Sequence, residues 1–134
     1  MSDKFFDDLQ RAAKHAYDNA YAPYSNFSVG AAALTFEDKI ITGCNVENAS
    51  YGLTVCAERN CLASGIVQGE QKFRTIVIYT ETSKLTPPCG ACRQVISEFL
   101  EPNAIVSATN QLGERVDWSV AELLPDAFTP KDLE

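Results

Sequence analysis

A strand–helix–strand pattern in the second half of the chain constrains the fold most strongly. The segment TIVIYT at 75–80 is rich in β-branched residues, which favour a buried strand, and the segment 104–109 predicts a second strand. Residues 89–100 lie between them, begin directly after two prolines and predict a helix. Such a crossover normally makes its two strands parallel and lays the helix on one face of the sheet. The chain is therefore predicted to be an α/β protein.

The rest of the chain adds elements on both sides of this unit. The predicted elements are a first helix at 5–20, a strand hairpin at 29–36 and 39–46, a polar loop at 47–55, a helix at 56–68 and a short helix at 119–124. The 134 residues suffice for one hydrophobic core and are too few for two ordinary domains. We expect a single domain over residues 1–134, folded as a three-layer α/β/α sandwich on a mixed, mostly five-stranded sheet.

The charge balance excludes some classes of partner. With 18 acidic and 11 basic residues the formal net charge is −7, whereas nucleic-acid binding depends on clustered Lys and Arg that neutralise phosphates. The apolar runs, such as 29–34, are well short of the roughly 20 residues that a membrane span needs. The start MSDKFFDDLQ is acidic and does not resemble a secretory signal. We expect a cytoplasmic protein that binds neither nucleic acids nor membranes.

Five cysteines in a reducing compartment favour metal or redox chemistry over a disulfide framework. Cys56 begins one predicted helix, and Cys89 and Cys92 begin the next, where their spacing places both sulfurs on one face. Two consecutive crossover helices beside a parallel strand pair start at the same sheet edge, so the three sulfurs can converge. Helix N-termini also favour the thiolate, which is the form that binds metal. Three thiolates and one open position are typical of catalytic zinc, since a structural site uses four ligands.

Two short cysteine motifs of the chain resemble those of a known class of enzyme. C-A-E at 56–58 and P-C-G-A-C at 88–92 resemble the signature of zinc-dependent nucleobase and nucleoside deaminases, in the version with Cys as the first ligand. Three further segments are similar to the short, homotetrameric cytidine deaminases, namely PYSNFSVGAA at 23–32, GCNVENASY at 43–51 and LLPDAF at 123–128. The similarity covers nearly the whole chain. It departs from the family at Asp126, where glycine is frequent, and at Asn60-Cys61, where Thr-Ala is common.

The resemblance implies hydrolytic deamination of cytidine and 2′-deoxycytidine to uridine and 2′-deoxyuridine, with release of ammonia, as a step of pyrimidine salvage. It assigns one zinc ion per chain to Cys56, Cys89 and Cys92, where the metal activates a water for attack on C4 of the pyrimidine. Glu58 is then the proton shuttle that serves the water, ring N3 and the leaving amino group. On this basis Glu58, the acid in the segment LTVCAER at 53–59, takes part in the reaction and does not only complement the helix dipole.

The resemblance also implies how the nucleoside is held. The backbone N–H of Ala57 binds the base carbonyl, Asn45 and Glu47 bind the ribose hydroxyls, and Phe27 packs on the nucleoside. An amide beside a carboxylate suits a pair of hydroxyls because together they offer donors and acceptors. The implied assembly is a homotetramer whose active sites are shared, with Phe128 supplied by a neighbouring subunit.

Charge at the metal predicts two further residues. Three thiolates give a zinc site one net negative charge, which makes the metal a poorer Lewis acid. Hydrogen-bond donors behind the sulfurs offset this charge. Arg59 is the main candidate for such a donor, and Arg93 is the second.

Other functions explain part of the sequence. A thioredoxin-like dithiol protein would use Cys89-Gly90-Ala91-Cys92 but leaves Cys56 and Glu58 unexplained. Within the deaminases, the runner-up is a nucleic-acid editor, which the net charge disfavours. Blasticidin-type deaminases share the zinc motif, but the surroundings formed by Phe27, Asn45 and Glu47 indicate a nucleoside substrate.

A binding module with structural zinc is the remaining alternative. It needs Cys44, Cys61 or His15 as a fourth ligand. We expect instead that both cysteines are buried as small hydrophobic residues and that His15 lies at or near the surface of the first helix.

Overall fold

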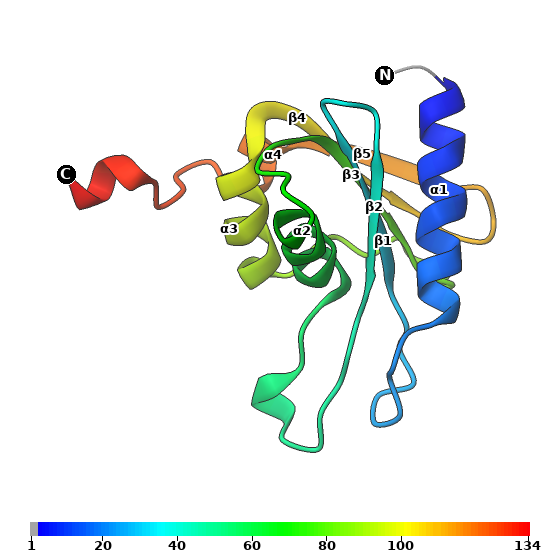
Figure 1. Ribbon diagram of the computed structural model, residues 1–134. Helices are drawn as coiled ribbons and strands as arrows, with labels where there is room; N and C mark the ends of the chain where they lie inside the picture. The colour runs from blue at the N-terminus through cyan, green and yellow to red at the C-terminus, as the bar shows by residue number, and fades with distance from the viewer. Residues whose placement is uncertain (1–2) are drawn as a thin grey trace.

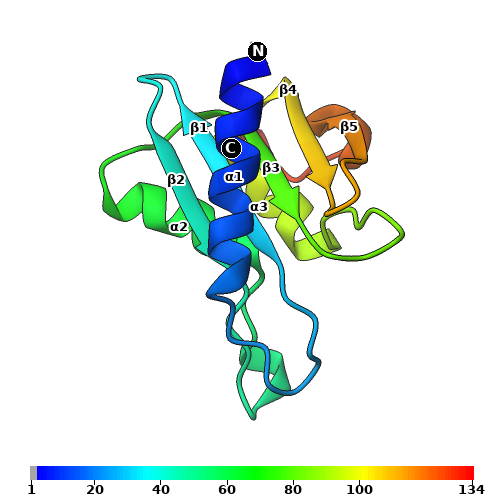
Figure 2. The same cartoon turned by 90° about the vertical axis from the view of Figure 1, so that its right-hand side faces the viewer.

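The computed structural model describes residues 3–134, in which a five-stranded sheet lies between two helical layers (Figures 1 and 2). The elements are α1 (Asp3–Asp18), β1 (Gly30–Thr35), β2 (Ile40–Cys44), α2 (Ala57–Val67), β3 (Phe73–Tyr79), α3 (Gly90–Phe99), β4 (Leu100–Thr109), β5 (Arg115–Ser119) and α4 (Val120–Leu123), with short 3-10 helices at Tyr51–Leu53 and Pro130–Leu133. The strand order is β2-β1-β3-β4-β5, and only the β3–β4 pair is parallel. The predicted three-layer α/β/α sandwich on a mixed sheet is confirmed.

Strand β1 is buried on both faces because helices cover both sides of the sheet. Its residues Ala32 and Leu34 pack in the cluster under α1, whereas Ala31 and Ala33 belong to the cluster under α2 and α3. This alternation follows the two-residue period of a strand. The small side chains of GAAALT let a helix approach closely from either side.

The register places the ends of several strands at one edge of the sheet. Gly30 at the start of β1 pairs with Cys44 at the end of β2 and with Tyr79 at the end of β3, and Tyr79 pairs with Thr109 at the end of β4. Because β2 and β3 are both antiparallel to β1, they run in the same direction. The connections to α2 and α3 therefore leave from the same edge, as predicted.

Two strands differ from the prediction in position. The fourth strand begins at Leu100, four residues before the predicted segment 104–109, and its pairing with β3 shifts register between Phe73 and Thr75. The fifth strand occupies Arg115–Ser119, which the sequence pattern indicated only as a connection after Gly113. An edge strand with alternating charged and apolar residues has a weak signal, because one of its faces meets solvent.

The helices otherwise lie close to their predicted places. Helix α2 begins one residue after Cys56 and ends one residue before Gln68, and Gly69 follows with a φ of 96°, which ends the helix in the left-handed region. In the described part of the chain, no helix has both the length and the apolar composition to cross a membrane.

Gly30 sets the separation between α1 and the sheet. A Cβ atom at this position would overlap the carbonyl oxygen of Ala13 in α1 and lie 2.5 Å from the backbone nitrogen of Tyr17. Gly30→Ala should therefore lower the free energy of unfolding by about 3 kcal/mol, the upper range for overpacking. Gly52→Ala is the matched control, because nothing lies within 4 Å of its Cβ position. Equal stability of both variants in chemical denaturation would show that α1 can move away without cost.

Candidate metal centre and active site

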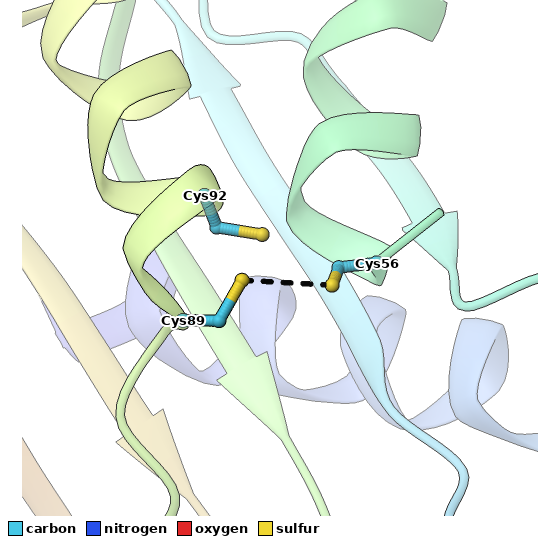
Figure 3. Close-up of side chains that lie close together, drawn as sticks. All are labelled: Cys56, Cys89 and Cys92. Carbon is cyan, nitrogen blue, oxygen red and sulfur yellow. Dashed lines mark hydrogen bonds between the residues drawn. The ribbon is translucent and has the colours of Figure 1, made fainter. Parts of the chain in front are cut away.

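The three cysteines predicted to bind zinc lie together at the starts of α2 and α3, with their sulfurs directed toward one another (Figure 3). All three Sγ atoms lie within 4.8 Å of one another, and 3.7 Å separates the Sγ atoms of Cys56 and Cys89. Sulfurs bound tetrahedrally at about 2.3 Å from zinc are about 3.8 Å apart. The donor set and its spacing therefore fit a zinc ion.

The helix starts determine where these sulfurs point. Cys56 and Cys89 are the N-cap residues of α2 and α3, with extended backbones (φ −70°, ψ 158° and φ −69°, ψ 169°), and neither helix has a side-chain cap. Cys92 lies in the first turn of α3 and is fully buried. First-turn N–H groups have no partner within the helix, so two helix N-termini direct positive potential at the sulfurs.

The first negative charge among the sulfurs belongs to Cys56. Hydrogen bonds with Cys92, Arg59 and Cys89 lower the pKa of the Cys56 thiol to about 5. The hydrogen bond to Cys56, together with burial, raises the pKa of the Cys92 thiol. Three thiolates at this spacing therefore need a cation to offset their repulsion, and a divalent metal ion provides it.

The two arginines predicted behind the metal have different contacts. Arg59 donates from Nη2 to the Sγ of Cys56 at 3.5 Å, and its Nε is buried without a hydrogen-bond partner among the described residues. Arg93 donates instead to backbone carbonyls, from Nε to Pro88 at 2.8 Å and from Nη1 to Leu123 at 3.2 Å. Arg59 thus contacts a sulfur, whereas Arg93 joins the residue before Cys89 to α4.

Glu58 is a buried carboxyl group beside this cluster. Its residue is only 5% exposed at the second position of α2. Burial raises the pKa of its carboxyl to about 7. A carboxyl with this pKa can both accept and donate a proton near neutral pH, which is what a general acid–base needs. Ala57, directly before it, is fully buried and supplies one of the free N–H groups at the helix start.

A backbone bridge brings the predicted sugar-binding residues next to the metal centre. Val46 and Val55 exchange two hydrogen bonds of 3.0 Å, so the segment 45–47 lies beside the residue that precedes Cys56. Asn60 strengthens this arrangement, because its Nδ2 donates to the carbonyl of Cys44 at 2.9 Å and to that of Val55 at 3.4 Å. Asn60, one of the departures from the family pattern, therefore ties α2 to both segments.

Asn45 fixes the segment that carries Phe27. The amide of Asn45 donates from Nδ2 to the carbonyl of Phe27 at 2.8 Å, and its Oδ1 accepts from the N–H of Val29 at 2.9 Å. One N–H and one lone pair of the amide stay available for a ligand.

Glu47 is held by the same loop. Its Oε1 accepts from the N–H groups of Tyr24 at 3.0 Å and Ser25 at 3.2 Å, and the Ser25 hydroxyl donates to Oε2. Chiefly the Ser25 hydroxyl lowers the pKa of Glu47, so this group is a carboxylate at neutral pH. A carboxylate accepts about four hydrogen bonds, so Oε2 keeps room for one more. No sequence pattern singles out Ser25, although it lies within the PYSNF segment.

Phe128 lies on the C-terminal segment, which extends away from the body of the molecule beyond α4 (Figure 1). Its side chain is exposed at 59%, and its carbonyl accepts from Nε2 of Gln94 at 3.0 Å. The exposed ring is free to contact another molecule.

The residues proposed as alternative fourth ligands lie elsewhere. Cys61 is buried and its Sγ donates to the carbonyl of Ile41 at 3.2 Å, Cys44 is half-buried, and His15 is exposed on α1. Within residues 3–134, the group of side chains able to hold a metal contains only Cys56, Cys89 and Cys92. This composition leaves a ligand position open, as a catalytic zinc site requires.

A family model described as the cytidine and deoxycytidylate deaminase zinc-binding region matches residues 4–117. The chain belongs to the cytidine and deoxycytidylate deaminase family. A cytidine deaminase of Halalkalibacterium halodurans is 44% identical over 125 residues, which cover 93% of this chain and 95% of that protein. A cytidine deaminase of Mycobacterium tuberculosis is 38% identical over 136 residues, with 99% and 96% coverage.

Solved deaminase structures have the same architecture. The crystal structure of a cytidine deaminase from Burkholderia pseudomallei superposes with a TM-score of 0.88 at 48% identity and covers 96% of this chain and 100% of that one. The matched zinc-binding region includes all three clustered cysteines, and so the prediction of zinc as the cofactor of this deaminase is confirmed. Membership of this family also excludes the thioredoxin-like alternative.

The zinc centre makes a direct prediction about metal content. The protein should bind one zinc per chain, and Cys56→Ala or Cys89→Ala should lose it, because two thiolates hold zinc far more weakly than three. Cys44→Ala is the matched control and should keep its zinc. Metal analysis of dialysed protein measures the ratio. Full zinc in Cys89→Ala, or its loss in Cys44→Ala, would contradict the ligand assignment.

Proposed function

We propose that this protein hydrolyses the amino group of cytidine and 2′-deoxycytidine, giving uridine or 2′-deoxyuridine and ammonia, as a cytoplasmic enzyme of pyrimidine salvage. The observation that carries the proposal is the convergence of three cysteine sulfurs beside the buried carboxyl of Glu58. Cys56, Cys89 and Cys92 would hold the zinc ion. A bound zinc supplies Lewis-acid activation of water at neutral pH.

Glu58 moves the protons of the reaction. The carboxylate takes one proton from the attacking water and delivers it to ring N3 while the oxygen adds to C4. It then takes the second proton of that water and delivers it to the amino group, which leaves as ammonia. The pKa of about 7 suits both directions of transfer. Water has then been added and ammonia lost, with N3 left protonated as in uridine.

The residues around Glu58 hold the nucleoside. The free N–H of Ala57 donates to the carbonyl oxygen of the base, and Phe27 packs on the ring. Asn45 and Glu47 bind the sugar hydroxyls with the donor and acceptor positions that their loop contacts leave open.

Arg59 moderates the charge of the metal centre. Its guanidinium donates to the Sγ of Cys56 and draws negative charge from the thiolate. Arg93 acts on the same centre less directly, by fixing the backbone before Cys89.

We further propose that the single domain assembles as a homotetramer with shared active sites. Large apolar side chains are exposed on the projecting segments, with Tyr51 at 75%, Leu53 at 66% and Phe128 at 59%. Side chains of this size gain most when a neighbouring subunit covers them. Phe128 would complete the active site of that neighbour.

The function is tested by turnover and by one conservative substitution. The zinc-loaded protein should convert cytidine to uridine, and Glu58→Gln should lower kcat by about 10³-fold or more, since the amide cannot exchange protons. Loss of the cytosine absorbance measures turnover, and metal analysis should show unchanged zinc. Glu98→Gln, an exposed site on α3, is the control. A folded, zinc-loaded protein inert on both nucleosides would refute the proposed function.

The shared site is tested by complementation. Phe128→Ala and Glu58→Gln should each be impaired alone, but mixed assemblies contain sites that combine Glu58 of one chain with Phe128 of another. Co-expression under two affinity tags and sequential purification isolates these assemblies. The activity of the mixed assemblies, divided by the number of chains with an intact Glu58, should exceed the activity of Phe128→Ala alone. Full activity of the wild type at monomer mass in light scattering would contradict the proposal.

A further inference from the structure

One hydroxyl group connects two parts of the proposed nucleoside site. The Oγ of Ser25 donates to Oε2 of Glu47 and accepts from the backbone N–H of Phe27 at 3.0 Å. The backbone N–H of Ser25 adds a bond to Oε1 of the same carboxylate at 3.2 Å. Ser25 thus links the side chain assigned to the sugar with the residue assigned to the base.

The turn around Ser25 is built to hold this arrangement. Asn26 has a φ of 57°, in the left-handed region that asparagine tolerates better than most residues. Its N–H donates to the carbonyl of Ala22 at 3.0 Å, which closes the turn. The chain therefore reverses so that the N–H of Phe27 points back at the Ser25 hydroxyl.

The peptide groups of Phe27 are fixed from two sides. Ser25 accepts from its N–H, and Asn45 donates to its carbonyl at 2.8 Å. The partners that fix Phe27 are therefore Asn45, which contacts the sugar in the proposed function, and Ser25, which holds Glu47.

We propose that Ser25 is a positioning residue that sets the carboxylate of Glu47 for the sugar hydroxyls and so favours nucleosides with those hydroxyls over nucleosides without them. The inference rests on the proposed function, in which Glu47 binds the sugar and Phe27 the base. Without the Ser25 hydroxyl, Oε1 of Glu47 keeps its two backbone donors, while Oε2 loses the one donor that it has among the described residues. The carboxylate is then free to turn, and the N–H of Phe27 loses its acceptor.

The test compares two substrates and three variants. Ser25→Ala removes the hydroxyl and Ser25→Thr retains one. Ser28→Ala makes the same kind of change in the same loop, where the Ser28 hydroxyl has no hydrogen bond to the described residues. kcat and KM are measured for cytidine and for 2′,3′-dideoxycytidine, which lacks both hydroxyls.

Ser25→Ala should raise KM for cytidine about tenfold with kcat nearly unchanged, as expected for one lost hydrogen bond to a charged group. The loss of kcat/KM should be clearly smaller for 2′,3′-dideoxycytidine. Ser25→Thr should recover most of the affinity, and Ser28→Ala should resemble the wild type. Equal losses on both nucleosides, or an equal effect of Ser28→Ala, would overturn the inference.

A double-mutant cycle tests whether Ser25 acts through Glu47. When Glu47→Gln is already present, adding Ser25→Ala should cost much less cytidine affinity than in the wild type. Strictly additive losses would overturn the inference and leave the proposed function intact. A wild-type protein inert on both substrates would overturn the inference and the proposed function together.

Discussion

The position of β1 between β2 and β3 is the constraint on which the active site depends. Because β1 is antiparallel to both neighbours, β2 and β3 run in the same direction and deliver α2 and α3 from one sheet edge. The close approach of the helices to the sheet then sets the distances between the sulfurs. At Gly43 of β2, a Cβ would overlap the backbone nitrogen of Cys61 in α2, so the absence of a side chain lets this helix lie against the strand. The sulfur spacing is therefore a consequence of strand direction and close layer packing.

Two ionisable groups that lie close together in the site have pKa values shifted in opposite directions. The thiol of Cys56 has a pKa lowered by hydrogen bonds, whereas the carboxyl of Glu58, two residues later, has a pKa raised by burial. The opposite shifts suit opposite tasks, because a metal ligand must be ionised and a proton shuttle must change its state. Arg59 supports the ionised state of Cys56, because it donates a hydrogen bond to the sulfur of Cys56 and not to the carboxyl of Glu58.

The sequence predicted this centre better than its surroundings, for a physical reason. Cys56, Cys89 and Cys92 lie at helix starts, where local spacing and strand order predict that the sulfurs can converge, and the family resemblance assigns the zinc to them. The contacts of Arg93 and Ser25 depend instead on tertiary positions of backbone carbonyls and a carboxylate, which no local pattern encodes. The fifth strand was not located for a similar reason, because its pairing with β4 provides much of its order.

The two halves of the site therefore differ in how they are held. The metal half stands on the starts of two packed helices, with Cys92 buried and Cys89 exposed. The nucleoside half lies on loops held by side-chain-to-backbone bonds from Asn45, Glu47 and Asn60. A packed helix tolerates little change of position, because a shifted helix start moves a ligand by ångströms. A loop held by separate hydrogen bonds can lose one and keep the rest. Substrate preference in such an enzyme can therefore change through single loop side chains while the zinc chemistry stays intact.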